Sequence, residues 1–131
     1  METVDSVGIA ADRATIMAMD DVDVPQCEVT ELPDVLGDTA ALLDVREPDE
    51  WQGGHAPGAQ HIPLGEVPAR LAEIDTTKEL FVICHFGGRS QRVAQYLVRN
   101  GFDAVNVVGG MAAWAAAGRP VVTDDGAPGS I

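Results

Sequence analysis

The stretch LFVICHFGGRSQRVAQYLVRNG, residues 80–101, decides the fold of this chain. It opens with a short apolar run at 80–83, which is typical of a strand covered on both faces of a sheet. From Ser90 to Asn100 apolar side chains recur at helical spacing, and Gly101 follows where helices commonly end in a left-handed residue. A strand that leads directly into a helix predicts one unit of an α/β domain.

Further strand and helix patterns alternate on either side of this unit. The predicted strands are residues 27–29 (an edge strand), 40–45, 60–62 (a short central strand) and 104–108. The predicted helices are residues 66–74 and 111–117. This alternation predicts a three-layer α/β domain with a central, mainly parallel sheet and helices on both faces.

The chain of 131 residues has the length of one domain. Residues 1–25 carry six acids and one base, and 123–131 are rich in turn-forming residues. We expect an acidic, poorly ordered tail at 1–25, a domain at 26–122 and a flexible tail at 123–131. The alternative for residues 11–19 is a short helix laid against the domain.

The composition excludes several classes of protein. A net charge of −13 repels nucleic acid phosphate and anionic lipid, so neither is an expected partner. The chain begins without a basic and apolar signal sequence, and no apolar run approaches the ~18 residues of a membrane span, which predicts a cytoplasmic location. The two cysteines, Cys27 and Cys84, are too few for a disulfide scaffold and lack zinc-site spacing, so we expect no metal and no cofactor.

Cys84 follows a predicted strand, and ligands of parallel sheets bind beyond the carboxyl ends of strands. Gly87 and Gly88 permit backbone angles that aim amides inward, and the following helix start adds positive potential that favours a reactive thiolate. Three arginines and no acid stand between Leu80 and Phe102, which favours an anionic substrate. The alternative is a buried cysteine that ends a core strand.

Four segments of the chain, in this order, resemble the rhodanese (thiosulfate sulfurtransferase) family in its single-domain form. The segments are LDVRE with EW (43–51), GHAPGA with IP (54–63), CHFGGRS (84–90) and GG with WAAAGRPV (109–121). The resemblance extends over residues 26–122. It implies a rhodanese-like fold with a five-stranded parallel sheet between helices.

The resemblance also implies a mechanism in which Cys84 is the catalytic nucleophile. Its thiolate would attack the outer sulfur of thiosulfate or a similar small anionic donor, release sulfite and become a persulfide, which cyanide or a thiol would discharge. Amides of the loop would surround the sulfur, and Arg89 would bind the sulfonate end of the donor. The implied substrate-binding residues are His85, Phe86, Gly87, Gly88, Arg89 and Ser90.

Two other functions remain open at this stage. A persulfide carrier or interaction module would hold the same sulfur on Cys84, loaded by a partner protein of a sulfur relay. A cysteine phosphatase or arsenate reductase is the lesser alternative. Such phosphatases have five residues between cysteine and arginine, whereas only four separate Cys84 from Arg89. The shorter loop should fit sulfur and crowd a tetrahedral phosphate.

Several polar residues outside the loop are expected to have structural roles. The resemblance implies that Asp44 and Arg46 form an ion pair that holds loops together, with Arg46 at the pocket mouth as the alternative. It also implies that His55 is a turn residue hydrogen-bonded to backbone. We expect His61 to be exposed or to cap a helix.

The remaining candidates are a cysteine, two tryptophans and a histidine. Cys27 is expected to be a small apolar residue of the first strand, and the alternative is a resolving thiol for Cys84. Trp51 and Trp114 are expected to fill the core. His85, beside the nucleophile, could adjust specificity or add positive charge.

Overall fold

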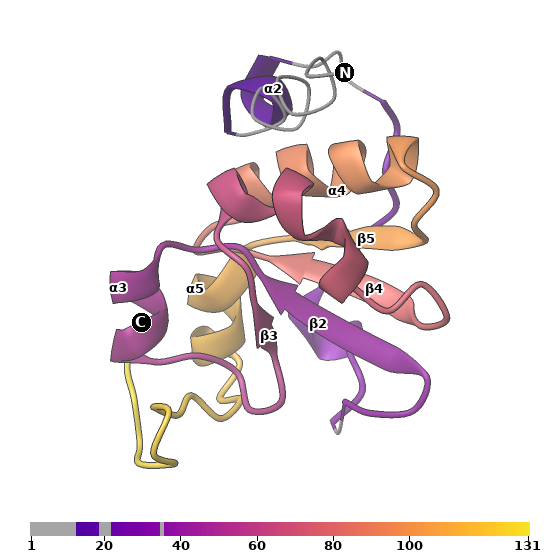
Figure 1. Cartoon of the computed structure of the whole chain (residues 1–131). Coiled ribbons are helices and arrows are strands. Elements are labelled where there is room, and N and C mark those ends of the chain that lie inside the picture. Colours follow the sequence, from indigo (N-terminus) through magenta and orange to yellow (C-terminus); the bar gives the residue numbers. More distant parts are fainter. Residues whose placement is uncertain (1–12, 19–21, 35) are drawn as a thin grey trace.

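The computed structural model describes residues 13–18, 22–34 and 36–131, and its centre is a five-stranded sheet in which every strand pair is parallel (Figure 1). The strands are β1 (Gln26–Cys27), β2 (Ala40–Asp44), β3 (Gln60–His61), β4 (Glu79–Ile83) and β5 (Ala104–Val107). Their spatial order is β1-β5-β4-β2-β3. The predicted α/β fold with a parallel sheet is therefore confirmed, as is the edge position of the first strand.

One strand lies elsewhere than predicted, because β3 forms the second edge of the sheet and not a central strand. It pairs only with β2, through Gln60 and His61. Both side chains are polar and half-buried, which suits an edge, whereas a central strand of a parallel sheet is apolar on both faces.

Helices lie on both faces of the sheet (Figure 1). In chain order they are α2 (Arg13–Ala18), α3 (Pro48–Gly53), α4 (Gly88–Arg99) and α5 (Gly110–Ala116), with the 3₁₀ helices η1 (Val29–Glu31), η2 (Leu64–Glu66) and η3 (Pro68–Glu73). The predicted α-helix over 66–74 is thus two 3₁₀ segments, because Pro68 donates no backbone hydrogen bond and Arg70 leaves helical angles (φ −121°, ψ 21°). The short α3 was not predicted, although Pro48 and a capping box between Glu47 and Glu50 mark its start.

The sheet separates two apolar clusters, one on each face, because side chains alternate along each strand. Leu43, Val82 and Cys84 belong to the face that α2 and α4 cover, and Phe81 and Val107 belong to the face that α5 covers. Figure 1 shows α2 and α4 on one side of the strands and α5 on the other. This is the expected three-layer arrangement.

The amino-terminal segment differs from the predicted tail where the structure describes it. Residues 1–12 and 19–21 lie outside the described residues, but 13–18 form α2. Ile16 of this helix is fully buried in the cluster beneath α4 and η2. For residues 13–18 the alternative of a docked helix replaces the expectation of a tail, because one apolar side chain has a core site to fill.

Residues 123–131 also depart from the flexible tail that was predicted. They turn at Thr123, whose amide donates to Ala127 O at 2.8 Å, and return along the end of α3. There the Ser130 amide donates to Gly53 O at 2.9 Å. Backbone hydrogen bonds thus tie this segment to the domain.

None of the described helices is long and apolar enough to cross a membrane.

Candidate active site

The candidate nucleophile lies at the carboxyl edge of the sheet. Strands β2 and β4 run side by side and end together, with Asp44 opposite Ile83. Beyond them the Val45 amide donates to Ile83 O at 3.0 Å, and Cys84 begins the loop that leads into α4. Cys84 therefore lies beyond the carboxyl edge of the sheet, where ligands of parallel sheets commonly bind.

The sulfur of Cys84 is held by hydrogen-bond donors from its own loop. The amide of Gly87 lies 3.1 Å from Sγ, and the amide and hydroxyl of Ser90 each lie 3.3 Å from it. The residue is only 1% exposed, so these donors act where water screens them little. The arrangement can stabilise negative charge on sulfur.

The backbone of this loop is held in place by the left-handed angle of Gly87 and by hydrogen bonds from α5. Gly87 has φ +111°, a left-handed angle that other residues rarely adopt, and an added Cβ would come within 3.3 Å of Gly109 N. The Met111 amide donates to Cys84 O at 2.8 Å, and the Ala112 amide donates to His85 O at 2.9 Å. The first turn of α5 thus binds the loop carbonyls and keeps them from turning toward the sulfur.

The other predicted loop residues lie at the rim. Phe86 is 73% exposed, and the ring of His85 meets it edge-on with centroids 4.3 Å apart. Gly88 is exposed, with open space where a Cβ would lie. The structure therefore brings Gly87 and Ser90 to the sulfur and leaves these three residues around it.

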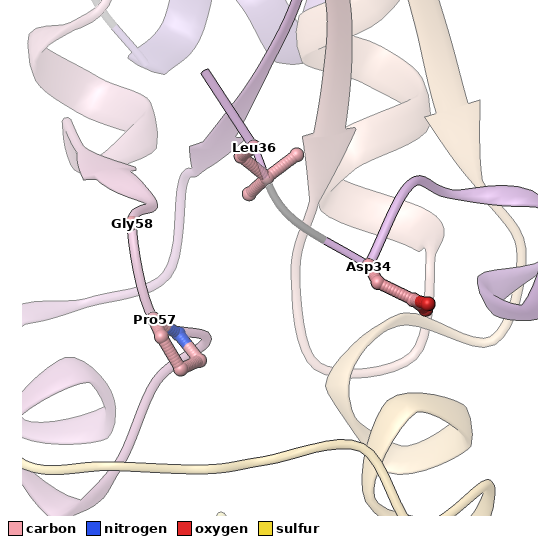
Figure 2. Close-up of a pocket in the computed structure, with 4 residues that line it drawn as sticks. All are labelled: Asp34, Leu36, Pro57 and Gly58. Atoms are coloured by element: carbon pink, nitrogen blue, oxygen red, sulfur yellow. The ribbon is translucent and has the colours of Figure 1, made fainter.

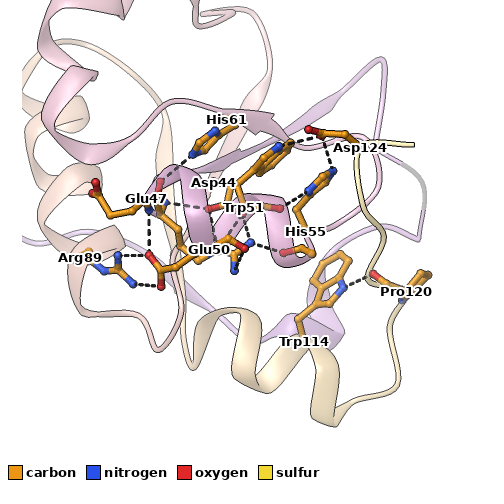
Figure 3. Close-up of polar contacts among 12 residues, drawn as sticks. Asp44, Glu47, Glu50, Trp51, His55, His61, Arg89, Trp114, Pro120 and Asp124 are labelled. Carbon is orange, nitrogen blue, oxygen red and sulfur yellow. Dashed lines mark hydrogen bonds and ion pairs between the residues drawn. The ribbon is translucent and has the colours of Figure 1, made fainter. Parts of the chain in front are cut away.

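The guanidinium of Arg89 is bound by a residue that sequence reasoning did not single out. Its Nη1 and Nη2 donate to Glu50 Oε1 and Oε2 at 2.7 and 2.9 Å (Figure 3). Hydrogen bonding to Arg89 is the main cause that lowers the pKa of Glu50 from an ordinary 4.5 to about 2. The two residues lie 39 positions apart, so no local pattern could reveal the pair.

A second missed residue is Asn106, which is buried within β5. The Ser90 hydroxyl donates to its Oδ1 at 2.6 Å, and its Nδ2 donates to Gln26 Oε1 at 2.8 Å. The sequence contained a signal for this hydrogen-bonding role, because Asn106 is a single amide inside an apolar strand and a buried amide needs hydrogen-bond partners.

Asp44 and Arg46 form the expected structural ion pair. Both side chains are 0% exposed, and Arg46 Nη2 lies 2.8 Å from Asp44 Oδ2. The same Nη2 donates to Gly54 O at 2.8 Å, which joins β2 to the end of α3. Full burial rules out the alternative of Arg46 at the pocket mouth.

Trp51 does not fill the core, contrary to the prediction, whereas Trp114 does. Trp51 is half-buried on α3, and its ring stacks on His55 at 3.5 Å and on His61 at 4.7 Å between centroids (Figure 3). The expectation was wrong because His55 and His61 cover the Trp51 ring by stacking, so this ring needs no place in the core. His55 Nδ1 donates to Trp51 O at 2.9 Å, in line with its expected turn role. The expectation for His61 was wrong, because it is half-buried in β3 and its Nε2 donates to Arg46 O at 2.8 Å, so it is neither exposed nor a helix cap.

Cys27 packs against the opposite face of the sheet from Cys84. Burial, followed by the nearby carboxylates of Glu31, Glu79 and Glu28, raises the pKa of Cys27 from 9.0 to about 11. A half-buried thiol that stays protonated matches the small apolar residue that was expected. Among the described residues, no group of three His, Cys, Asp or Glu side chains is placed to hold a metal ion.

A surface pocket lies away from the nucleophile (Figure 2). It is lined by Asp34, Leu36, Pro57 and Gly58. These residues precede β2 and β3, at the amino ends of the strands, whereas Cys84 lies beyond the carboxyl end of β4. The position of Cys84, and not this pocket, therefore defines the candidate site.

The chain is thus a small α/β domain with a parallel five-stranded sheet and, at the carboxyl edge of that sheet, a loop that begins with Cys84. Residues 28–117 match the rhodanese-like domain family, and the chain belongs to that family. Among solved structures, the chain is similar to a rhodanese-like domain protein from Staphylococcus aureus. That match has 34% identity and a TM-score of 0.65, and it covers 70% of this chain and 91% of the other.

Two curated relatives come from Bacillus subtilis strain 168. A putative sulfur carrier protein, YrkF, is 47% identical over 74 residues, which are 56% of this chain and 40% of the relative. A putative sulfurtransferase, YtwF, is 44% identical over 79 residues, which are 60% of this chain and 77% of the relative. The match thus spans less than half of the first relative. These similarities support sulfur transfer in general.

Proposed function

We propose that this protein is a sulfurtransferase that moves sulfane sulfur from thiosulfate or a similar donor to a thiophilic acceptor through a persulfide on Cys84. The hydrogen-bond cradle carries the proposal, because the amides of Gly87 and Ser90 reach Sγ at 3.1 and 3.3 Å. These donors favour a thiolate and, after transfer, a negatively charged persulfide. A free thiol nucleophile suits the reducing cytoplasm, which we propose as its compartment.

In the first half-reaction the Cys84 thiolate attacks the outer sulfur of thiosulfate. A bond forms between Sγ and that sulfur, the S–S bond of the donor breaks, and sulfite leaves with the electron pair. Arg89, His85 and Phe86 contact the donor at the rim, with Gly88 open to it. In the second half-reaction, cyanide or a thiol attacks the outer sulfur of the persulfide and restores the thiolate.

The test is thiocyanate formation from thiosulfate and cyanide by wild type, Cys84→Ser and Cys27→Ser. We expect activity in wild type and Cys27→Ser and none in Cys84→Ser, because Cys27 lies on the other face of the sheet. Retained activity in Cys84→Ser would refute the proposal. Hydrolysis of an aryl phosphate without sulfur transfer would instead favour the phosphatase alternative.

The second candidate is a persulfide carrier that a partner protein loads. The 47% identity to a putative sulfur carrier protein favours it. A sulfur-relay partner is also favoured by a structural neighbour described as an NAD-dependent persulfide reductase from A. fulgidus. That match is 35% identical with a TM-score of 0.57, and it covers 70% of this chain and 16% of the neighbour. A carrier would gain one sulfur on Cys84 from a cysteine desulfurase and form little thiocyanate from free thiosulfate.

A further inference from the structure

Arg89 is not available as a free cation in the structure. Both of its terminal nitrogens donate to the two carboxylate oxygens of Glu50, a geometry that fixes the guanidinium and neutralises its charge. Both side chains are about a quarter exposed (27% and 28%), so the pair lies at the edge of the site and not inside the core. With a pKa of about 2, Glu50 keeps its negative charge throughout the physiological pH range.

The surroundings of the pair give a sulfonate little to bind. Glu47, at the start of α3, adds a further carboxylate that acts on Arg89 (Figure 3). Its 3.8 Å ion pair with Arg13 is exposed to solvent and therefore neutralises its charge little. Arg46 is buried in its own ion pair with Asp44. Across the loop the exposed ring of Phe86 offers an apolar contact. A donor that approaches Cys84 therefore meets a neutralised arginine, an additional negative charge and an aromatic ring.

We propose that Glu50 is a specificity-determining residue, which masks Arg89 and directs the site toward persulfide donors with an uncharged tail in preference to thiosulfate. This inference rests on the proposed sulfur transfer to Cys84 and names the donor class for it. To bind thiosulfate through Arg89, the protein must break two charge-assisted hydrogen bonds and leave the Glu50 carboxylate facing a sulfonate. An uncharged tail requires neither change.

The loading step with such a donor is balanced without any other reactant. The Cys84 thiolate attacks the terminal sulfur of the persulfide R–S–SH, and a bond forms between Sγ and that sulfur. The S–S bond of the donor breaks, and its electron pair leaves with the thiolate R–S⁻, which takes the proton of the transferred –SH group and becomes the thiol R–SH. The transferred sulfur takes its charge into the amide cradle, and only the neutral R group meets the rim.

The test compares two donors in single-turnover loading of the 131-residue chain, and mass spectrometry measures the gain of one sulfur. The donors are thiosulfate and 2-hydroxyethyl persulfide, and the proteins are wild type, Glu50→Gln and Asp49→Asn, with Cys84→Ser as the baseline. Glutamine can still accept the hydrogen bond that Glu50 Oε1 receives from the Glu47 amide, so α3 keeps its cap. Asp49 is exposed in the same turn and provides a matched loss of one charge.

We expect wild type to load faster from the persulfide than from thiosulfate. Glu50→Gln should raise the ratio of thiosulfate loading to persulfide loading about ten-fold, because the competing charge beside Arg89 is gone. Asp49→Asn should leave that ratio within about two-fold. A merely structural role of Glu50 would change both loading rates together and leave the ratio constant.

Two results would overturn the inference while the proposed function stands. One is wild-type loading that is as fast from thiosulfate as from the persulfide, and the other is an unchanged ratio in Glu50→Gln. If no protein gains sulfur on Cys84 from either donor, the proposed function fails, and the donor preference fails with it.

Discussion

The hydroxyl of Ser90 has one proton and two acceptors within reach. Asn106 Oδ1 lies 2.6 Å from it and Cys84 Sγ lies 3.3 Å away. The side-chain amide of Asn106 is oriented by Gln26, whose oxygen accepts from Nδ2 at 2.8 Å. The shorter contact favours Asn106, so the backbone amides of Gly87 and Ser90 are the donors that remain committed to the sulfur.

The role proposed for Arg89 makes a kinetic prediction at this scale. Arg89→Ala should raise the KM for thiosulfate about ten-fold and change kcat less, because the substitution removes the partner of Glu50 and leaves an unpaired carboxylate that repels the anionic donor. Steady-state thiocyanate assays measure both constants. Arg99→Ala, at the exposed end of α4, is the control for loss of one positive charge. An unchanged KM in Arg89→Ala would remove Arg89 from donor binding.

At the scale of elements, the contact between α5 and the nucleophile loop depends on Gly110. This residue has φ +57°, and an added Cβ would lie 2.3 Å from Cys84 O and 2.6 Å from His85 O. Gly110→Ala should lower the free energy of unfolding by about 2–4 kcal/mol, because backbone atoms must separate to admit the methyl group. Urea denaturation measures this loss.

Gly88→Ala provides the comparison within the same loop. Its Cβ would meet nothing within 4 Å, and Gly88 does not have a left-handed φ. We expect a change in the free energy of unfolding within about 1 kcal/mol. Equal destabilisation by the two substitutions would contradict the tight contact between α5 and the loop.

The Glu50–Arg89 pair joins α3 to α4 and makes their contact sensitive to acid. Because folding lowers the pKa of Glu50 to about 2, its stabilising effect is fully present above about pH 4.5. The effect is lost as the pH falls from about 4.5 through about 2, where the carboxylate becomes protonated in the folded state as well. The difference in the free energy of unfolding between wild type and Glu50→Gln should therefore shrink over that range.

Urea denaturation at a series of pH values measures this difference. Asp49→Asn, on the same helix, should give a smaller difference from wild type at every pH. A wild-type advantage over Glu50→Gln that stays constant down to pH 2 would contradict an ionised pair.

At the scale of the whole molecule, α2 completes the covering of one sheet face. Ile16 is fully buried in the same cluster as Leu97 of α4, although its helix has only six residues. Ile16→Ala should lower the free energy of unfolding by about 2–4 kcal/mol, because it leaves a cavity in a packed core. Met17→Ala, at a position 42% exposed, should change it by about 0.5 kcal/mol or less. Equal effects of the two substitutions would show that α2 does not dock.

The sequence was sufficient for the features that depend on local pattern. Apolar runs located β2, β4 and β5, and helical spacing located α4, because each pattern lies within one element. The position of Cys84 between a strand and a helix start placed it at the carboxyl edge of the sheet. The sequence also located β3 at 60–62 but predicted it as a central strand and not an edge strand, and it predicted an α-helix at 66–74 where Pro68 leads to 3₁₀ segments.

Tertiary structure alone decided which side chains meet across the fold. Glu50 reaches Arg89 over 39 positions, and Ser90 reaches Asn106 over 16. A hydrophobic pattern specifies which face of an element is buried, because burial depends on the period of apolar residues along that element. It does not specify the strand order and helix placement that bring two distant polar groups within hydrogen-bond distance. The position of Cys84 at the edge of the sheet is therefore encoded locally, whereas the pairing of Glu50 with Arg89 beside it arises only on folding.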